Sequence, residues 1–269
     1  MIHFFRFWIV TISFTLFSCT TTITNSDGTL VGTSVDKKKL AEIYTNLAIE
    51  YQNKDALPIA LSRVNLAIEN NSNYAKAYMV RATIYQQLKK PNLAMDDFNS
   101  AIKLDKISSD IKTNYAIFLC EQRDYITADK LFVEALNNPL YETPAIAYLA
   151  SGNCNCRQKK YKQANEDYLQ ALTYKRVPQD IYVNIARLQY EENNYKLANF
   201  YMQQYHGVNT ASVLWLRIQI LDKLMNKNNA LDNITYVNMI KLLGAKLVKN
   251  FPNSSETQIY LQYTQESHN

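Results

Sequence analysis

The chain has 269 residues, of which 47% are hydrophobic and 20% charged, and its formal net charge is +5. This composition is typical of a globular protein that can bury a large core. The weak positive excess is spread along the chain, whereas nucleic acids and anionic lipids usually require clustered Lys and Arg. We therefore expect no nucleic-acid partner. Only five glycines occur, which predicts a mainly helical protein.

The N-terminal segment, 1–18, is short and apolar, and a single cysteine follows it. The run from Phe7 to Phe17 contains only apolar and hydroxyl side chains, and it is too short to cross a bilayer, which takes about 20 residues. Such a run predicts an export signal. The closing sequence "LFSC" resembles the lipobox of bacterial lipoproteins, which implies that residues 1–18 are a lipoprotein signal peptide and that Cys19 carries the lipids. A plain signal peptide with an incidental cysteine is the alternative.

Residues 19–38 are interpreted as a flexible tether between the lipid anchor and the folded body. The segment is rich in Thr, Ser and Asn, so it cannot bury enough apolar surface to offset the entropy of ordering it. The run Lys37, Lys38 and Lys39 is expected to be the solvated end of the tether, just before the first helix. By the lipoprotein resemblance, Thr20 in place of aspartate implies attachment to the outer membrane, on its periplasmic face.

Five similar segments follow one another between positions 40 and 210, and their spacing determines the expected fold. Their first alanines recur at a nearly constant interval: Ala60, Ala94, Ala128, Ala164 and Ala198. A period of about 34 residues with this pattern resembles the tetratricopeptide repeat, in which each unit is a pair of antiparallel helices. We expect the small alanines to let the two helices approach closely, and a bulkier residue four positions later to fill the gap to the next unit.

The expected fold is all-α, a tetratricopeptide-repeat solenoid of about six helix-turn-helix units plus a C-terminal capping helix. Residues 39–210 would form five units, and residues 211–269 a degenerate sixth unit, with a polar loop at 226–233, and the capping helix, which Ser254 or Ser255 would cap. Gly152 takes a small-residue position inside a predicted helix, which predicts a close backbone contact there. Polar residues expected to cap helices between the two halves of a unit are Asp55, Asn92, Asp124 and Asn194.

The end of the chain resembles one particular family. A lipid-anchored tether, six units, "LWLRIQI" opening the last unit and "LVKNFPNSSETQIY" closing it are similar to the PilF/PilW group of type IV pilus pilotin lipoproteins. The specific positions are Trp215, Phe251, Pro252, Ser254 and Glu256. The resemblance implies a scaffold that supports assembly of an outer-membrane secretin. Its protein partner would be a secretin subunit or another type IV pilus component, and it would reach the membrane through its lipid anchor.

An alternative reading keeps the anchor and the repeats but changes the partner. The protein would then be a lipid-anchored adaptor for the insertion of outer-membrane barrel proteins or for peptidoglycan hydrolases. An enzyme is not expected, because His3, His206 and His268 lie in no catalytic pattern. Phosphate-binding loops and HExxH zinc motifs do not occur either, so we expect no cofactor and no metal.

Three cysteines in the repeats, Cys120, Cys154 and Cys156, are expected to be small packed side chains. Residues two apart on a helix point to different sides, so Cys154 and Cys156 should not bond to each other. Cys120 and Cys156 occupy equivalent positions in neighbouring units, where helix axes about 8–10 Å apart disfavour a bridge. An oxidising envelope keeps a bridge between these two open as the alternative.

The remaining candidate site is the surface of the first helices, which line the concave side of tetratricopeptide superhelices. By the repeat register, the partner-binding residues are Ile49, Met79, Thr83, Ile117, Leu149, Asn153, Val183, Arg187 and Tyr190. Apolar, hydroxyl and amide side chains dominate this set, which predicts binding of an extended or helical peptide. First helices are packed on one side and open on the other, so any of these residues could instead belong to the core.

Overall fold

The computed structural model describes residues 36–225 and 230–266. The expected signal peptide, Cys19 and residues 20–35 of the expected tether lie outside the described residues. The described residues form thirteen helices: α1 (Lys37–Asn53), α2 (Leu57–Asn70), α3 (Ala75–Gln87), α4 (Pro91–Leu104), α5 (Ser109–Glu121), α6 (Tyr125–Leu136), α7 (Pro144–Arg157), α8 (Tyr161–Ala171), α9 (Asp180–Glu191), α10 (Tyr195–Gln204), α11 (Ala211–Met225), α12 (Ala230–Asn250) and α13 (Ser255–Glu266).

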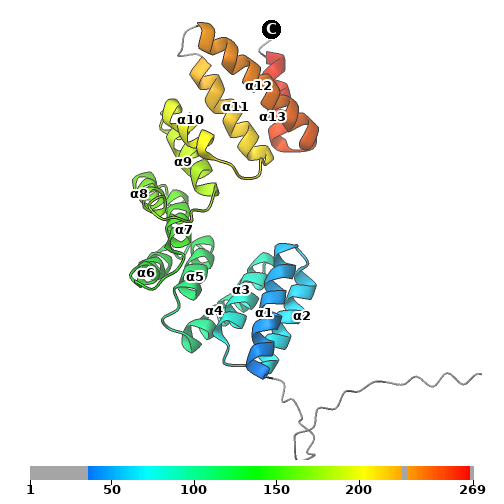
Figure 1. Ribbon diagram of the computed structural model, residues 1–269, viewed down its shortest axis with the longest axis vertical. Coiled ribbons are helices and arrows are strands. Elements are labelled where there is room, and N and C mark those ends of the chain that lie inside the picture. The colour runs from blue at the N-terminus through cyan, green and yellow to red at the C-terminus, as the bar shows by residue number, and fades with distance from the viewer. Residues whose placement is uncertain (1–35, 226–229, 267–269) are drawn as a thin grey trace, which may run out of the picture.

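The helices pack in sequence as six pairs, from α1 with α2 to α11 with α12, and α13 lies against both helices of the last pair. The pairs stack into an arc, in which α6 and α8 lie on the outer side and α5, α7 and α9 on the side toward which the arc opens (Figure 1). First helices of successive pairs touch directly at α1–α3, α3–α5 and α5–α7. The all-α repeat fold predicted from the alanine spacing is therefore confirmed. None of the described helices is long and apolar enough to cross a membrane.

Two helix boundaries differ from the sequence prediction. Helix α1 begins at Lys37, because Asp36 Oδ1 accepts hydrogen bonds from the N–H groups of Lys38 and Lys39 at 3.0 and 3.3 Å and so caps the helix. The three lysines thus form the first turn of α1 rather than the end of the tether. Helix α12 begins at Ala230, inside the expected polar loop at 226–233.

The repeated alanines lie where the helices of each pair meet. The first alanines of the five repeats are completely buried: Ala60, Ala94, Ala128, Ala164 and Ala198. The bulkier residues four positions later are buried as well: Val64, Phe98, Phe132, Tyr168 and Met202. The predicted repeat register is confirmed, because the first alanine and the bulkier residue of every repeat are buried.

The turns within the first five pairs share one backbone geometry. A non-glycine residue with φ between 55° and 67° occupies the left-handed region in each turn: Asp55, Lys89, Arg123, Lys159 and Asn193. The next N–H donates to the carbonyl five residues earlier, for example from Lys90 to Tyr85 at 2.9 Å, which closes a Schellman motif. Glycine is the usual residue here because it has no β-carbon to clash.

Of the four residues predicted to cap these helices, only Asp124 does so. Its Oδ1 accepts from the Thr127 N–H at 3.2 Å. The prediction is wrong for the other three, each for a different reason. Asp55 takes the left-handed position and Asn92 lies within the first turn of α4. Asn194 donates its amide to Gln189 Oε1 at 3.1 Å instead of capping α10.

The family-like positions at the C-terminus form the joint that seats α13. Ser254 Oγ accepts from the Thr257 N–H at 3.2 Å, so it is Ser254 rather than Ser255 that caps the helix. The Thr257 hydroxyl donates to the Phe251 carbonyl at 2.7 Å, so the turn after α12 is closed by hydrogen bonds. The rings of Trp215 and Tyr263 meet edge to face with centroids 6.5 Å apart. These contacts bury the open end of the last pair under α13.

Candidate functional site: the inner face of the first helices

The inner face consists of the side chains that α1, α3, α5, α7 and α9 direct away from their second helices. Hydrogen bonds cross it between neighbouring first helices: Gln52 Nε2 to Thr83 Oγ1 at 3.1 Å, Gln86 Nε2 to Glu121 Oε2 at 2.7 Å, and Asn184 Nδ2 to Asn153 Oδ1 at 2.7 Å. Each bond joins two successive pairs. Polar groups of the inner face therefore link neighbouring pairs through hydrogen bonds and help to fix their relative position.

Four predicted apolar residues form the half-buried part of this face: Ile49, Met79, Ile117 and Leu149. Each packs against a core cluster with part of its side chain and leaves part of it accessible. Met79 also lines a hollow of about 410 Å³ at the junction of pairs two and three. An apolar strip of this kind can accept apolar side chains of a peptide.

Val183 does not belong to the accessible surface, although the register placed it there. Its side chain is 6% exposed and packs in the core with Ala186 and Met202. The same position of the repeat is buried in the first and third pairs, where Thr45 and Thr113 are 0% and 1% exposed. In these pairs, as in the fifth, the position lies on the packed side of the first helix.

The polar members of the predicted set differ in exposure. Asn153 and Arg187 are exposed, and Thr83 is half-buried with its hydroxyl also bonded to the Val80 carbonyl at 2.8 Å. The half-buried ring of Tyr190 lies 5.5 Å from that of Tyr195, centroid to centroid. Exposed amide and guanidinium groups beside an apolar strip can bind both the backbone and the termini of a peptide.

Tyr168 fixes the position of Asn153. Burial raises the pKa of the Tyr168 hydroxyl, so the group stays protonated and donates to Asn153 Oδ1 at 2.8 Å. The Asn153 oxygen therefore accepts two bonds, one from the core and one from Asn184 of the next pair. This arrangement turns the Asn153 side chain into a fixed feature of the inner face.

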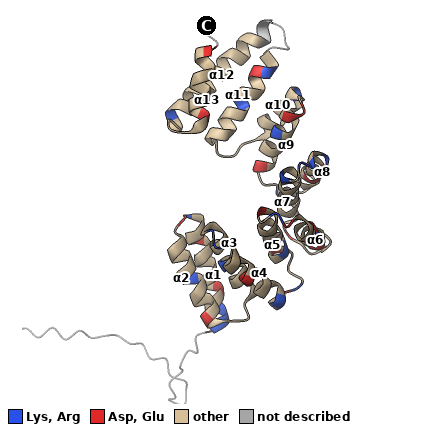
Figure 2. Cartoon of the chain, turned by 180° about the vertical axis from the view of Figure 1, so that it is seen from behind, with Lys and Arg blue, Asp and Glu red and all other residues tan. Residues whose placement is uncertain are grey.

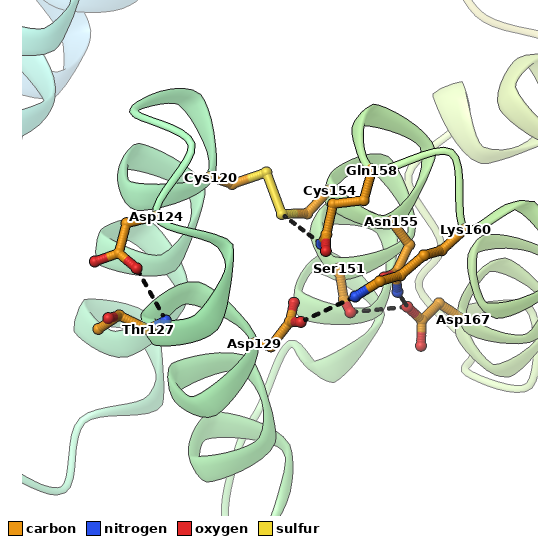
Figure 3. The surroundings of a disulfide bond; sticks show 10 residues. All are labelled: Cys120, Asp124, Thr127, Asp129, Ser151, Cys154, Asn155, Gln158, Lys160 and Asp167. Atoms are coloured by element: carbon orange, nitrogen blue, oxygen red, sulfur yellow. Dashed lines mark hydrogen bonds and ion pairs between the residues drawn. A yellow bond between two sulfur atoms is a disulfide. The ribbon is translucent and has the colours of Figure 1, made fainter.

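A disulfide joins Cys120 of α5 to Cys154 of α7, with Cα atoms 5.9 Å apart (Figure 3). The expectation of three unpaired cysteines is therefore wrong. Although helix axes lie about 8–10 Å apart, facing residues come much closer than the axes, and the observed Cα separation is within the usual range for a disulfide. Repeat equivalence matches Cys120 with Cys156 instead, and Cys156 is free and lies 3.4 Å from the Tyr168 hydroxyl.

Sequence reasoning missed the bridge although a signal was present. Cys120 and Cys154 have a sequence separation of 34, which is the commonest spacing between the repeats. Cys154 lies two residues before Cys156, the repeat equivalent of Cys120, and it is the Cys154 side chain that meets Cys120 of α5. The disulfide links pairs three and four at the inner face, so the pair junction there is covalent. Among the described residues, His, Cys, Asp and Glu side chains form no cluster of three that could hold a metal ion.

None of the protein-family models matches the chain. The type IV pilus assembly protein PilF of Pseudomonas aeruginosa is 25% identical over 239 residues, which is 88% of this chain and 90% of PilF. An uncharacterised protein of Haemophilus influenzae is 27% identical over 108 residues, which is 40% of this chain and 60% of that protein.

Solved structures agree with these sequence relatives. PilW, described as a widely conserved type IV pilus biogenesis factor, has a TM-score of 0.68 and 28% identity, covering 83% of this chain and 99% of the PilW chain. Pseudomonas aeruginosa PilF has a TM-score of 0.69 and 23% identity over 84% of this chain and 99% of its own. The fold alone is shared with a tetratricopeptide-repeat protein from Parabacteroides merdae, at a TM-score of 0.59 and 17% identity over 84% of each chain. With six helix pairs, a capping helix and relatives of one group in both sequence and structure, the chain belongs to the PilF/PilW family of type IV pilus assembly tetratricopeptide-repeat proteins.

Proposed function

We propose that the protein is a non-catalytic, lipid-anchored assembly factor, a pilotin, for the outer-membrane secretin of a type IV pilus. The observation that carries the proposal is its similarity to PilF, a type IV pilus assembly protein, over 88% of the chain. A scaffold of this kind acts by holding an unassembled subunit, which requires a rigid surface and no reacting groups. The described body supports this role because its pairs are bridged by hydrogen bonds and one disulfide.

The inner face would bind an exposed segment of the secretin subunit. The half-buried strip of Ile117 and Leu149 suits apolar side chains, while Thr83, Asn153 and Arg187 suit backbone carbonyls or a carboxylate. These groups lie on successive first helices, so a segment bound there would run along the stack. The contact area would come from the length of the segment bound along the stack, not from its insertion into a deep pocket.

Lipidation at Cys19 would place this body at the periplasmic face of the outer membrane. Two acyl chains suffice for stable attachment, whereas one is marginal. The tether before α1 would give the body reach, and the anchor would raise the effective concentration of a bound subunit at the bilayer. Holding the subunit close to its destination favours assembly of the ring over loss of the monomer.

Deleting the gene tests this function. We expect fewer detergent-resistant secretin multimers and fewer surface pili, while the secretin monomer is still made. A protein carrying both Ile117→Glu and Leu149→Glu should reproduce the loss, because carboxylates would replace the apolar strip. Arg187→Glu adds a variant at an exposed position, where folding is not at risk.

The matched control lies on the outer helix α6. Ile126 and Val133 are 86% and 56% exposed, so Ile126→Glu with Val133→Glu adds the same two charges away from the inner face and should leave multimers intact. Melting curves of each variant separate loss of binding from loss of fold. Normal multimers and pili in the deletion strain, with general defects in outer-membrane barrel proteins or cell division, would contradict the proposal and favour the adaptor alternative.

A further inference from the structure

The turns of pairs two, three and four place a row of cations along one edge of the stack. We name this set the turn ridge: Lys89, Lys90, Arg123, Arg157, Lys159 and Lys160. All six residues are exposed. Basic segments are visible beside α7 and α8 in Figure 2. Within the described ranges, only Lys160 of this set forms an ion pair, with Asp129 Oδ2 at 3.7 Å (Figure 3).

Three members of the turn ridge occupy strained backbone positions. Lys89, Arg123 and Lys159 lie at the left-handed turn position with φ of 55°, 67° and 60°. Glycine adopts this conformation without steric cost, whereas a β-carbon crowds the neighbouring carbonyl. Three successive turns therefore carry a cation where glycine would be more stable.

Two further members oppose the helix that they precede. Lys90 and Lys160 are the N-cap residues of α4 and α8, and neither side chain makes a capping hydrogen bond. The N-terminal end of a helix is also its positive end, where a cation is unfavourable. In the turn between them Asp124 caps α6 normally, so the fold accepts a capping residue at this position.

The helix dipole does not account for this pattern. A cation near the C-terminal end of a first helix is favourable, but a residue within the last helical turn could supply it without left-handed strain. The same effect counts against Lys90 and Lys160. The turns of pairs two and four therefore lose stability in two ways, through a strained backbone and through a cation at the start of a helix. Such losses concentrate at functional positions.

A hollow beside the turn ridge indicates what it binds. About 500 Å³ in volume, it lies between pairs two, three and four, and both Lys89 and Arg157 line it. Its other polar lining comes from the amides of Gln86, Gln87 and Gln122 and from the Glu121 carboxylate, while Pro91 and Phe118 provide apolar surface. Glutamine side chains offer both a donor and an acceptor, which is what a polypeptide backbone requires.

We propose that the turn ridge binds an extended acidic polypeptide segment. Neighbouring helices lie about 8–10 Å apart. A segment in the extended polyproline II conformation rises about 3.1 Å per residue with about three residues per turn, so carboxylates at every third residue lie on one side of it, about 9 Å apart, and would meet successive turns. An anionic bilayer fits less well, because Glu121 and Asp129 lie among the cations and a flat anionic surface could not avoid them. The turn ridge borders the inner face at Gln86 and Glu121 but contains none of the predicted partner-binding residues, and the proposal does not depend on the secretin as partner.

The test uses the mature lipoprotein in nonionic detergent and a fluorescent peptide in which glutamate recurs at every third residue. A triple variant with Lys89→Gly, Arg123→Gly and Lys159→Gly should bind this peptide about tenfold more weakly, from three exposed charge pairs, and should melt at a higher temperature because strain is removed. A lower affinity together with a higher melting temperature would exclude misfolding as the cause of the weaker binding. Weaker binding is measured by fluorescence anisotropy at low salt, where exposed charges are least screened.

The matched control removes three exposed loop cations at the other edge of the stack, with Lys106→Gly, Lys175→Gly and Arg176→Gly. It has the same net charge as the triple variant and should retain affinity. Equal binding by the two variants, or equal binding of a peptide with glutamine in place of glutamate, would overturn the proposal. It would also be overturned if amine-reactive labelling of Lys89 and Lys159 in proteoliposomes were blocked by phosphatidylglycerol, since the occupant would then be the membrane.

Discussion

The ring of Tyr168 occupies the space that a β-carbon on Gly152 would need. Such a carbon would lie 2.6 Å from Tyr168 Cδ1 and closer still to Cε1. The close contact expected at Gly152 therefore exists, but its partner is an aromatic side chain of α8 rather than backbone. Pairs two and three have Ala82 with Phe98 and Ala116 with Phe132 in the same two positions of the repeat. The tyrosine hydroxyl, bonded to Asn153, distinguishes the fourth pair.

Gly152→Ala should destabilise the protein by about 1–3 kcal/mol through overpacking, although alanine is the better helix former. Adding Tyr168→Phe should recover part of this loss, because it recreates the alanine–phenylalanine combination of the third pair and lets the ring shift. Urea unfolding of the two single variants and the double variant measures the coupling. Simple additivity of the two effects would show that the ring is not held against Gly152 by its hydroxyl.

Breaking the disulfide should lower the free energy of unfolding by about 2–4 kcal/mol, because the bonded cysteines, at a sequence separation of 34, close a long loop. Cys120→Ser and Cys154→Ser should have equal effects, and reductant should abolish the difference from wild type. Cys156→Ser is the control, since this cysteine is unpaired. Non-reducing peptide mapping identifies the bonded pair directly, and a bond to Cys156 would contradict the assignment.

Arg123→Gly should stabilise the protein by roughly 0.5–1 kcal/mol, because relief of left-handed strain, about 1–2 kcal/mol, exceeds the added entropy of glycine in the unfolded chain. The neighbouring Gln122 has φ of −77° and gains nothing from glycine. Gln122→Gly should therefore destabilise the protein by up to about 1 kcal/mol. Melting temperatures that move in the same direction for both variants would argue against strain at Arg123.

Asp167 should make stability depend on pH in a defined direction. Burial raises its pKa, although Ser151 Oγ and Asn155 Nδ2 donate to its Oδ2 at 2.8 and 2.9 Å and oppose the shift (Figure 3). A raised pKa means that the folded state binds the proton more tightly. The resulting stabilisation is complete below the unfolded pKa of about 3.9 and is lost as pH rises through the folded pKa.

Wild type should therefore gain stability relative to Asp167→Asn as pH falls from about 7 to about 4. Urea unfolding of both proteins across this range gives the difference, and effects of other carboxylates cancel in it. A difference that stays constant, or that shrinks toward acid, would contradict the raised pKa. Direct NMR titration of the carboxyl carbon gives an independent value.

Cys19→Ala should leave a folded body that no longer sediments with outer-membrane vesicles after a salt wash. The prediction follows from the "LFSC" boundary, since lipids on Cys19 would supply the attachment. Mass spectrometry of the wild-type N-terminal peptide checks the modification. Continued membrane association of the variant at high salt would contradict lipidation as the anchor.

The repeat spacing determined much of the fold, because helix pairing is a local consequence of periodic small and large residues. From that spacing alone, Ala94 and Phe98 could be assigned to the core, and local capping preference placed the start of the last helix next to Ser254. The inner face could be assigned to the first helices for the same reason. Its individual members could not, because one position of the repeat is half-buried where Met79 or Leu149 occupies it and buried where Thr45, Thr113 or Val183 does.

The tertiary structure alone decided which side chains pair across helices. Cys120 bonds with Cys154 rather than its repeat equivalent, and Arg81 of α3 donates to both Asp97 oxygens of α4 at 2.7 and 2.8 Å. These contacts depend on small offsets between neighbouring helices, and periodicity carries no information at that scale. The alanine pattern is repeated in five units and tolerates such offsets, whereas a disulfide or a two-point ion pair forms only where two particular atoms meet.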